Sequence, residues 1–167
     1  MESCIGYYSS PIGIIEITAD DNSITGLIFS ERGDKKTEVK TTIPSGNPLI
    51  KKCISQLDEY FEGTRKIFDL PITNTGTQFQ KNVWKQLNEI PYGNTISYLS
   101  LSKNIGNIKA IRAVGAANGK NKISIIVPCH RVIGSSGEMI GYGGEVWRKK
   151  WLLDHEAKHR FGVQKLF

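Results

Sequence analysis

The sequence predicts an α+β protein built from two small domains, residues 1–75 and 76–167. Three observations lead to this prediction. The first 30 residues alternate apolar and polar side chains in short runs, which is typical of antiparallel strands. Most of the remaining chain repeats apolar residues at helical spacing. The charge balance also changes sign, because residues 1–75 hold 8 Lys/Arg against 11 Asp/Glu and residues 76–167 hold 14 against 5.

The first domain is expected to contain a three-stranded meander followed by one helix. Strands are predicted at residues 4–8, 12–18 and 24–29. Residues 31–46 are charged, rich in Thr and aperiodic, which predicts a loop. A helix fits residues 48–61, and Gly63 ends it. Cys53 lies on the apolar face of this helix and Cys4 lies in the first strand, so both are interpreted as structural residues.

The second domain is expected to be mostly helical. After a joint at residues 70–76, helices are predicted at residues 77–88, 97–104, 107–118 and 145–156. Thr77 and Asn107 are suitable N-caps for two of them. The short turn Ile105-Gly106 makes the two middle helices a helix-turn-helix candidate. The β-branched run Ile123 to Val127 predicts a strand.

The helix predicted at 107–118 has one face that is nearly bare of side chains, from which Lys109 and Arg112 project. The net charge of +9 on residues 76–167 favours a polyanionic partner. Together these features indicate that Arg112 approaches a nucleic-acid groove. Tight packing of the bare face against another helix, and a basic surface that only aids solubility, are the alternatives.

Cys129 is the cysteine best placed for chemistry. It follows Pro128 at the expected end of a strand, and the neighbouring His130 and Arg131 both favour thiolate over thiol. Adjacent side chains cooperate only if the chain turns there, which Pro128 permits. Glu156, near a helix end where negative charge is disfavoured, is a candidate to orient a histidine. A core cysteine and an exposed acid at a frayed helix end are the alternatives.

Composition excludes several classes of protein. The longest apolar run is far shorter than the roughly 20 residues of a membrane span, so no membrane partner is expected. The N-terminus does not resemble a secretory signal, which favours a cytoplasmic location. The chain has 3 cysteines, without a C-x-x-C pair or a zinc-like histidine spacing, and this argues against a disulfide framework or a metal site.

Several motifs of the second half occur in a fixed order, namely Phe79-Gln80-Lys81-Asn82-Val83-Trp84, Ile96-Ser97-Tyr98, Arg112-Ala113-Val114-Gly115, Asn121, Pro128-Cys129-His130-Arg131-Val132, Gly141-Tyr142 and Trp151-Leu152-Leu153-Asp154-His155-Glu156. In residues and spacing they resemble the O6-alkylguanine-DNA alkyltransferases, the methylated-DNA–protein-cysteine methyltransferases. The resemblance implies a ribonuclease-H-like first domain and a winged-helix-like second domain with the helix-turn-helix.

The resemblance also implies a function, which is DNA repair by direct reversal of damage. The protein would bind the minor groove of double-stranded DNA, flip out O6-alkylguanine and move the alkyl group irreversibly to Cys129 in one turnover. Activity on O4-alkylthymine is left open. The implied form is a monomer, and no metal or organic cofactor is implied.

Site roles follow from the resemblance residue by residue. Cys129 is the alkyl acceptor, His130 the base acting through a water, and Glu156 the acid that orients His130, while Asn121 braces the turn around them. Tyr98 would rotate a phosphate and Arg112 would replace the flipped base. Further DNA contacts are expected at Asn107 and Ser135, and the guanine pocket is expected at Val132, Tyr142 and Gly143.

Three positions depart from the family pattern: Gly143 where some members carry serine, Lys122 where proline is frequent, and Leu99 in place of a polar residue. Two other functions compete with repair. A non-catalytic alkyltransferase-like or helix-turn-helix DNA-binding protein is disfavoured by Cys129, since the alkyltransferase-like proteins lack a reactive cysteine. A cysteine hydrolase using Cys129 and His130 leaves the basic second half and Arg112 unexplained.

Overall fold

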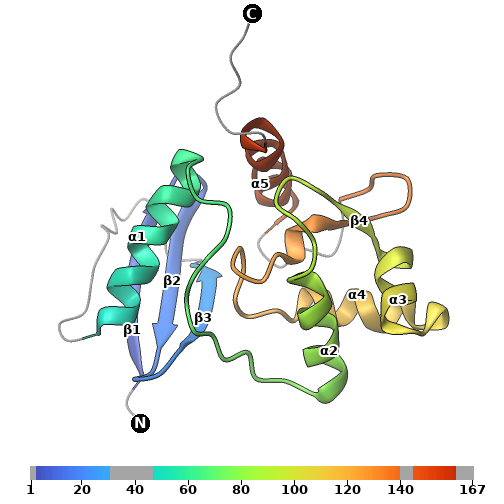
Figure 1. The fold of residues 1–167 in the computed structure, drawn as a ribbon, viewed down its shortest axis with the longest axis horizontal. Helices are drawn as coiled ribbons and strands as arrows, with labels where there is room; N and C mark the ends of the chain where they lie inside the picture. Colours follow the sequence, from blue (N-terminus) through green and yellow to red (C-terminus); the bar gives the residue numbers. More distant parts are fainter. Residues whose placement is uncertain (1–2, 31–46, 140–144, 161–167) are drawn as a thin grey trace, which may run out of the picture. The chain divides into compact units, whose positions relative to one another are not determined.

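The computed structural model describes residues 3–30, 47–139 and 145–160, and it has the predicted α+β class (Figure 1). The chain divides into two compact units, Met1–Asn74 and Thr75–Phe167. The loop predicted at 31–46 lies outside the described residues. So do Tyr142 and Gly143, the two pocket residues expected after Gly141.

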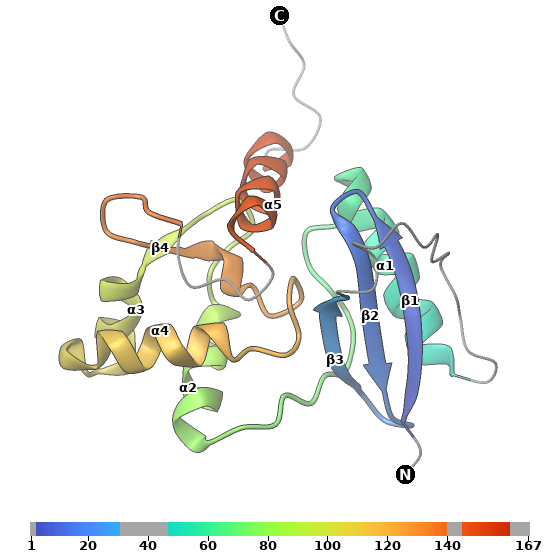
Figure 2. The same ribbon diagram turned by 180° about the vertical axis from the view of Figure 1, so that it is seen from behind.

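The first unit is a three-stranded antiparallel sheet with one helix on one of its faces (Figures 1 and 2). The strands are β1 (Cys4–Ser10), β2 (Gly13–Ala19) and β3 (Ile24–Phe29), in the spatial order β1-β2-β3. All three predicted strands are confirmed. The central strand alternates as expected, because Ile15 and Ile17 are fully buried whereas Glu16 between them is partly exposed.

The helix of the first unit, α1 (Pro48–Glu62), is defined by signals that the sequence carries. The Asn47 side chain accepts hydrogen bonds from the amides of Leu49 and Ile50, and Pro48 occupies the first turn. Gly63 ends the helix in the left-handed region, at φ 87°. Cys53 is fully buried on the core side of this helix, as expected, and burial raises the pKa of its thiol to about 12.

The second unit is mostly helical, as predicted. Its helices are α2 (Gln78–Leu87), α3 (Tyr98–Ile105), the 3₁₀ turn η2 (Ile108–Ala110), α4 (Ile111–Gly119), the 3₁₀ turn η3 (Cys129–Arg131) and α5 (Val146–His159). A parallel pair of two-residue strands, β4 (Ile96–Ser97) and β5 (Val132–Ile133), joins distant parts of this unit. The sequence did not reveal this pair, because two residues are too few to show an alternating pattern.

Caps and one buried hydrogen bond organise the helices of this unit. Thr77 and Gln80 form a reciprocal capping box at the start of α2. The α2 side chain of Trp84 is 3 % exposed and its indole nitrogen donates to the carbonyl oxygen of Ala117 in α4, at 2.9 Å. α2 is thereby fixed against the helix-turn-helix formed by α3 and α4, with Gly106 as the turn at φ 91°.

Three predictions about local structure in the second unit were wrong or imprecise. The strand predicted at 123–127 is absent, because residues 124–126 form a turn. The helix expected at 107–118 begins with η2, capped by Asn107, and becomes α-helical only at Ile111. α5 continues to His159, so Glu156 lies inside the last turn of the helix and not at a frayed end.

Candidate active site

A clamped turn leads the chain into the site. The Asn121 side-chain amide donates to the carbonyl oxygens of Ile123 and Val127, at 3.3 and 2.9 Å, and its oxygen accepts from the Ile123 amide at 3.1 Å. Ile125 has φ 71°, which is strained for a β-branched residue. A β-branched run normally favours a strand, but here the Asn121 bonds replace the strand's ladder and hold the reversal.

Cys129 opens η3 directly after this turn and is 4 % exposed. Burial raises the pKa of its thiol, while the Asn121 side chain and the charge of Lys149 lower it by less. The net direction is upward, because burial outweighs the neighbouring groups that favour a thiolate. Cys129 is a thiol in the resting protein, and reaction at its sulfur requires removal of a proton.

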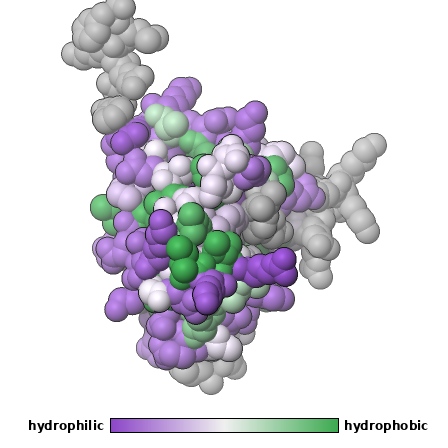
Figure 3. Space-filling model, turned by 90° about the vertical axis from the view of Figure 1, so that its right-hand side faces the viewer, coloured by the Kyte–Doolittle hydropathy of each residue, from purple (hydrophilic) through white to green (hydrophobic). Residues whose placement is uncertain are grey.

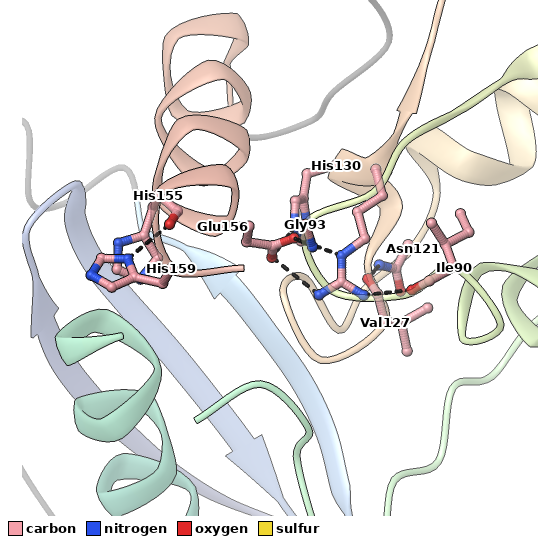
Figure 4. A network of polar contacts seen from close by, with 9 residues as sticks. Ile90, Gly93, Asn121, Val127, His130, His155, Glu156 and His159 are labelled. Atoms are coloured by element: carbon pink, nitrogen blue, oxygen red, sulfur yellow. Dashed lines mark hydrogen bonds and ion pairs between the residues drawn. The ribbon is translucent and has the colours of Figure 1, made fainter. Parts of the chain in front are cut away.

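His130 and Glu156 form a buried pair next to this thiol. His130 Nε2 lies 2.7 Å from Glu156 Oε2, and both side chains are 0 % exposed. Figure 4 shows Glu156 reaching from α5 toward His130. His130 Nδ1 is buried and has no hydrogen-bond partner within the described part of the chain. The pair thus comes from segments 26 residues apart, and η3 and α5 bring it together.

Arg131 binds the same carboxylate. Its Nε lies 2.8 Å from Glu156 Oε1 and its Nη2 lies 3.1 Å from Oε2, while Nη1 donates to the Ile90 carbonyl oxygen at 2.7 Å. The Gly93 amide also donates to Oε1, at 3.3 Å. Burial would raise the pKa of Glu156, but His130 and Arg131 outweigh it and hold that pKa well below its usual range. Glu156 is therefore an ionised carboxylate at neutral pH.

Lys149 is a further buried group of the site, and sequence reasoning missed it. It is 0 % exposed, and its Nζ lies 5.7 Å from the centre of the Tyr98 ring. Burial lowers its pKa to about 8, while the nearby Cys129 raises it by less. A lysine in the run Arg148-Lys149-Lys150 looks like part of a solvated surface. Its spacing of three and seven residues from Leu152 and Glu156 is the signal that places it on their buried face.

The residues expected to contact DNA are divided between the surface and the interior. Arg112 of α4, Asn107 and Ser135 are exposed. Tyr98, at the start of α3, is 8 % exposed. A Cβ atom placed on Gly115 would lie 3.9 Å from the Tyr98 ring, which is ordinary van der Waals contact. Val132, expected in the guanine pocket, is 0 % exposed and pairs with Ile96 through β4 and β5.

The surface around Arg112 mixes charge with apolar side chains. Ile108, the first residue of η2, and Ile111, the first residue of α4, are 51 % and 40 % exposed. Figure 3, seen from the side where α3 and α4 lie in Figure 1, shows a small hydrophobic patch bordered by hydrophilic side chains. Lys109 and Arg112 are exposed on the same segment. A surface that combines cationic and apolar side chains suits a nucleic-acid groove, which has anionic phosphates at its edges and apolar walls.

The described ranges, 3–30, 47–139 and 145–160, contain no group of three or more His, Cys, Asp or Glu side chains that could hold a metal ion. Within the same ranges, every helix is too short or too polar to cross a membrane.

Two family models match the chain. The model of the 6-O-methylguanine DNA methyltransferase ribonuclease-like domain matches residues 4–73, and the model of the DNA-binding domain of the same proteins matches residues 78–158. The chain belongs to this family. The resemblance seen in the motifs from Phe79 to Glu156 is thereby confirmed, and the family extends over the first unit as well.

Relatives of known name agree with this. The methylated-DNA–protein-cysteine methyltransferase of Methanosarcina acetivorans is 45 % identical over 90 % of this chain and 96 % of that protein. The constitutive enzyme of Bacillus subtilis is 41 % identical over 91 % of this chain and 96 % of that protein. The crystal structure of Mycobacterium tuberculosis OGT in complex with DNA is 42 % identical, covers 92 % of each chain and has a TM-score of 0.80.

Proposed function

We propose that this protein repairs DNA by moving the alkyl group of O6-alkylguanine to the sulfur of Cys129, once per molecule. Membership of the family carries the reaction class, which is transfer of an alkyl group from DNA to a protein cysteine. The residue assignment rests on one observation. His130, the residue after Cys129, forms a buried pair with Glu156. The proposed form is a cytoplasmic monomer that acts on duplex DNA.

The proton path follows from which atoms are already engaged. Glu156 is ionised and accepts from His130 Nε2, which assigns the hydrogen of neutral His130 to Nε2. His130 Nδ1 then presents a lone pair, and it has no bond to any described residue. Nδ1 is therefore the atom that takes the Cys129 proton, through a bridging water. Glu156 stabilises the imidazolium that forms.

The bonds balance without any added reagent. The thiolate sulfur attacks the alkyl carbon, a carbon–sulfur bond forms, and the bond from that carbon to guanine O6 breaks. The electron pair of the broken bond leaves with guanine, and the proton held by His130 returns to the guanine ring. A thioether is a very poor leaving group, so the cysteine is not regenerated and the protein is consumed.

The buried position of Cys129 requires that the base be brought to it. O6 of guanine is inaccessible inside a duplex, and extruding a base costs on the order of a few kcal/mol. Arg112 is exposed on α4, and we propose that it fills the gap that the flipped base leaves in the stack. Tyr98, Asn107 and Ser135 are proposed to hold the DNA backbone, and Val132 with Tyr142 and Gly143 to border the base.

The proposal is tested by stoichiometry on duplex DNA that contains one O6-methylguanine. Chromatography of the hydrolysed DNA measures how much guanine is restored. We expect the amount to equal the amount of active protein and then to stop, and we expect Cys129→Ser to restore none. Repeated turnover by the native protein, or full repair by Cys129→Ser, contradicts the proposed single-use chemistry at Cys129.

A further inference from the structure

Arg131 binds Glu156, the acid that is proposed to orient His130, through its guanidinium group. Three of its nitrogens make hydrogen bonds of 2.7 to 3.1 Å, two to the Glu156 carboxylate and one to the Ile90 carbonyl. Its side chain is 9 % exposed and the Glu156 side chain is 0 % exposed. A forked, charge-assisted pair of this kind fixes a carboxylate in both position and orientation.

The bonds divide the two oxygens of Glu156 between different tasks. Oε1 accepts from Arg131 Nε and from the Gly93 amide, whereas Oε2 accepts from Arg131 Nη2 and from His130 Nε2. Arg131 thus contacts both oxygens and sets the plane in which Oε2 meets the imidazole. Without that fork, rotation of the carboxylate would move Oε2 away from His130 Nε2.

The guanidinium also changes the charge that His130 experiences. A lone buried carboxylate would attract a proton to its partner imidazole, because a net negative pair is unfavourable in a medium of low dielectric constant. Arg131 already neutralises Glu156, so the site needs no second positive charge. Arg131 thereby weakens the attraction of Glu156 for a proton on His130.

We propose that Arg131 is a positioning residue for alkyl transfer, which aims Glu156 at His130 and keeps His130 in the neutral form that can accept a proton. This inference rests on the proposed roles of Cys129 and His130. It assigns to Arg131 a task different from the one the sequence suggested, which was to favour the Cys129 thiolate directly. Arg131 acts through Glu156.

Other titratable groups face the same cluster from several elements. Tyr92, before β4, has its ring centre 5.7 Å from the Arg131 guanidinium, and burial with Glu156 raises its pKa to about 12, so it stays neutral. Cys129 of η3 and Lys149 of α5 interact electrostatically with each other. Burial lowers the pKa of Lys149 to about 8, so Lys149 loses its charge in the mildly alkaline range.

The decisive experiment measures the transfer rate of Arg131→Met against pH, with the native protein in parallel. The variant lacks the positive charge that neutralises Glu156. The His130–Glu156 pair therefore binds a proton more tightly. We expect the rate at pH 7 to fall at least tenfold. We also expect the acid limb of the profile to move upward by about one pH unit, so that part of the loss is recovered at alkaline pH. A structural defect alone lowers the rate at every pH without moving the limb.

Two further variants separate charge, geometry and folding. Arg131→Lys keeps the positive charge but loses the fork, so we expect a lower rate with a smaller shift of the acid limb. Arg65→Met removes an arginine that pairs with Glu59 at 3.1 Å in the first unit, and we expect native kinetics. Arg131→Met is replaced if it does not fold. The transfer rate is then measured against pH for Arg131→Lys and for the double variant Arg131→Met/Glu156→Gln, which removes both charges.

The outcomes are distinguishable from failure of the proposed function. If Cys129 of the native protein does not become methylated, the proposed function fails and the inference fails with it. If Cys129 does become methylated but folded Arg131 variants keep the native rate and the native acid limb, only the inference fails. In a Glu156→Gln background, Arg131→Met should cause no additional loss of rate. A loss as large as in the native background would overturn the action through Glu156.

Discussion

Glu156→Gln is a sharp perturbation because the amide has nearly the shape of the carboxylate but cannot satisfy its surroundings. Each oxygen of Glu156 faces at least two donors, namely Arg131 Nε and the Gly93 amide at Oε1, and Arg131 Nη2 and His130 Nε2 at Oε2. Whichever way the amide is turned, its NH₂ group faces two donors. The buried guanidinium of Arg131 also loses its counter-charge.

The expected cost is large for a substitution that changes so little volume. Removing one partner of a buried ion pair costs roughly 3–5 kcal/mol of unfolding free energy. The loss also has a predicted pH dependence. The folded pKa of Glu156 lies well below the unfolded value of roughly 4.3, so the carboxylate stabilises the fold above that pH and its contribution is lost as the pH falls below it. Between pH 7 and pH 3 the difference between native protein and variant should shrink by about 2 kcal/mol.

Urea unfolding followed by tryptophan fluorescence measures this directly. The chain has 3 tryptophans, Trp84, Trp147 and Trp151, and all of them lie in the second unit, so the signal reports on the unit that contains Glu156. Glu145→Gln is the matched control, since Glu145 is exposed in the same unit, and we expect it to cost less than about 1 kcal/mol. A loss below about 1 kcal/mol for Glu156→Gln at pH 7, or a difference that does not shrink at pH 3, would refute the reasoning.

Three other predictions concern DNA, a second cysteine and packing. Arg112→Ala should lower the alkyl-transfer rate on duplex DNA at least tenfold, while transfer from free O6-benzylguanine, if it occurs, should change little. Stopped-flow or quenched assays on both substrates check this. Equal losses on the two substrates would reject the intercalating role. Cys53, with its pKa raised to about 12, should resist iodoacetamide in the native protein at pH 8 and react after unfolding, as peptide mass spectrometry can show; rapid native labelling would contradict its burial. Trp84→Phe removes the 2.9 Å bond to the Ala117 carbonyl and should cost about 1–3 kcal/mol in urea unfolding, and a neutral effect would argue against the α2–α4 link.

Local signals in the sequence predicted most of the fold. The meander of the first unit follows from alternation, and α1 follows from apolar residues at helical spacing and from Gly63 at its end. The helix-turn-helix follows from periodicity and Gly106. These features depend on interactions between neighbours in the chain, which a sequence displays directly.

The parts that escaped prediction depend on distant contacts. Ile123 to Val127 has the composition of a strand, yet three hydrogen bonds from one side chain, Asn121, impose a turn with Ile125 at φ 71°. The strands β4 and β5 exist only because Ile96 meets Val132 across 36 residues. Neither composition nor period encodes such a contact.

The candidate site divides in the same way. Cys129, His130 and Glu156 could be named from motifs, and the structure places His130 and Glu156 2.7 Å apart. Arg131 was named only as a neighbour of the thiol, and its bond to Glu156 could not be seen without the fold. Lys149 was hidden in a charged run whose helical phase only α5 reveals.

The measurement that tests the central claim most directly is the location of the transferred group. The protein is incubated with duplex DNA that carries O6-methylguanine with an isotopically labelled methyl group, digested, and its peptides are sequenced by mass spectrometry. Cys4 and Cys53 serve as internal controls for unspecific alkylation. We predict one labelled methyl per molecule, on Cys129 alone. Label on Cys4 or Cys53, on another side chain, or in released methanol while Cys129 stays unmodified would contradict the assignment of Cys129 as the acceptor.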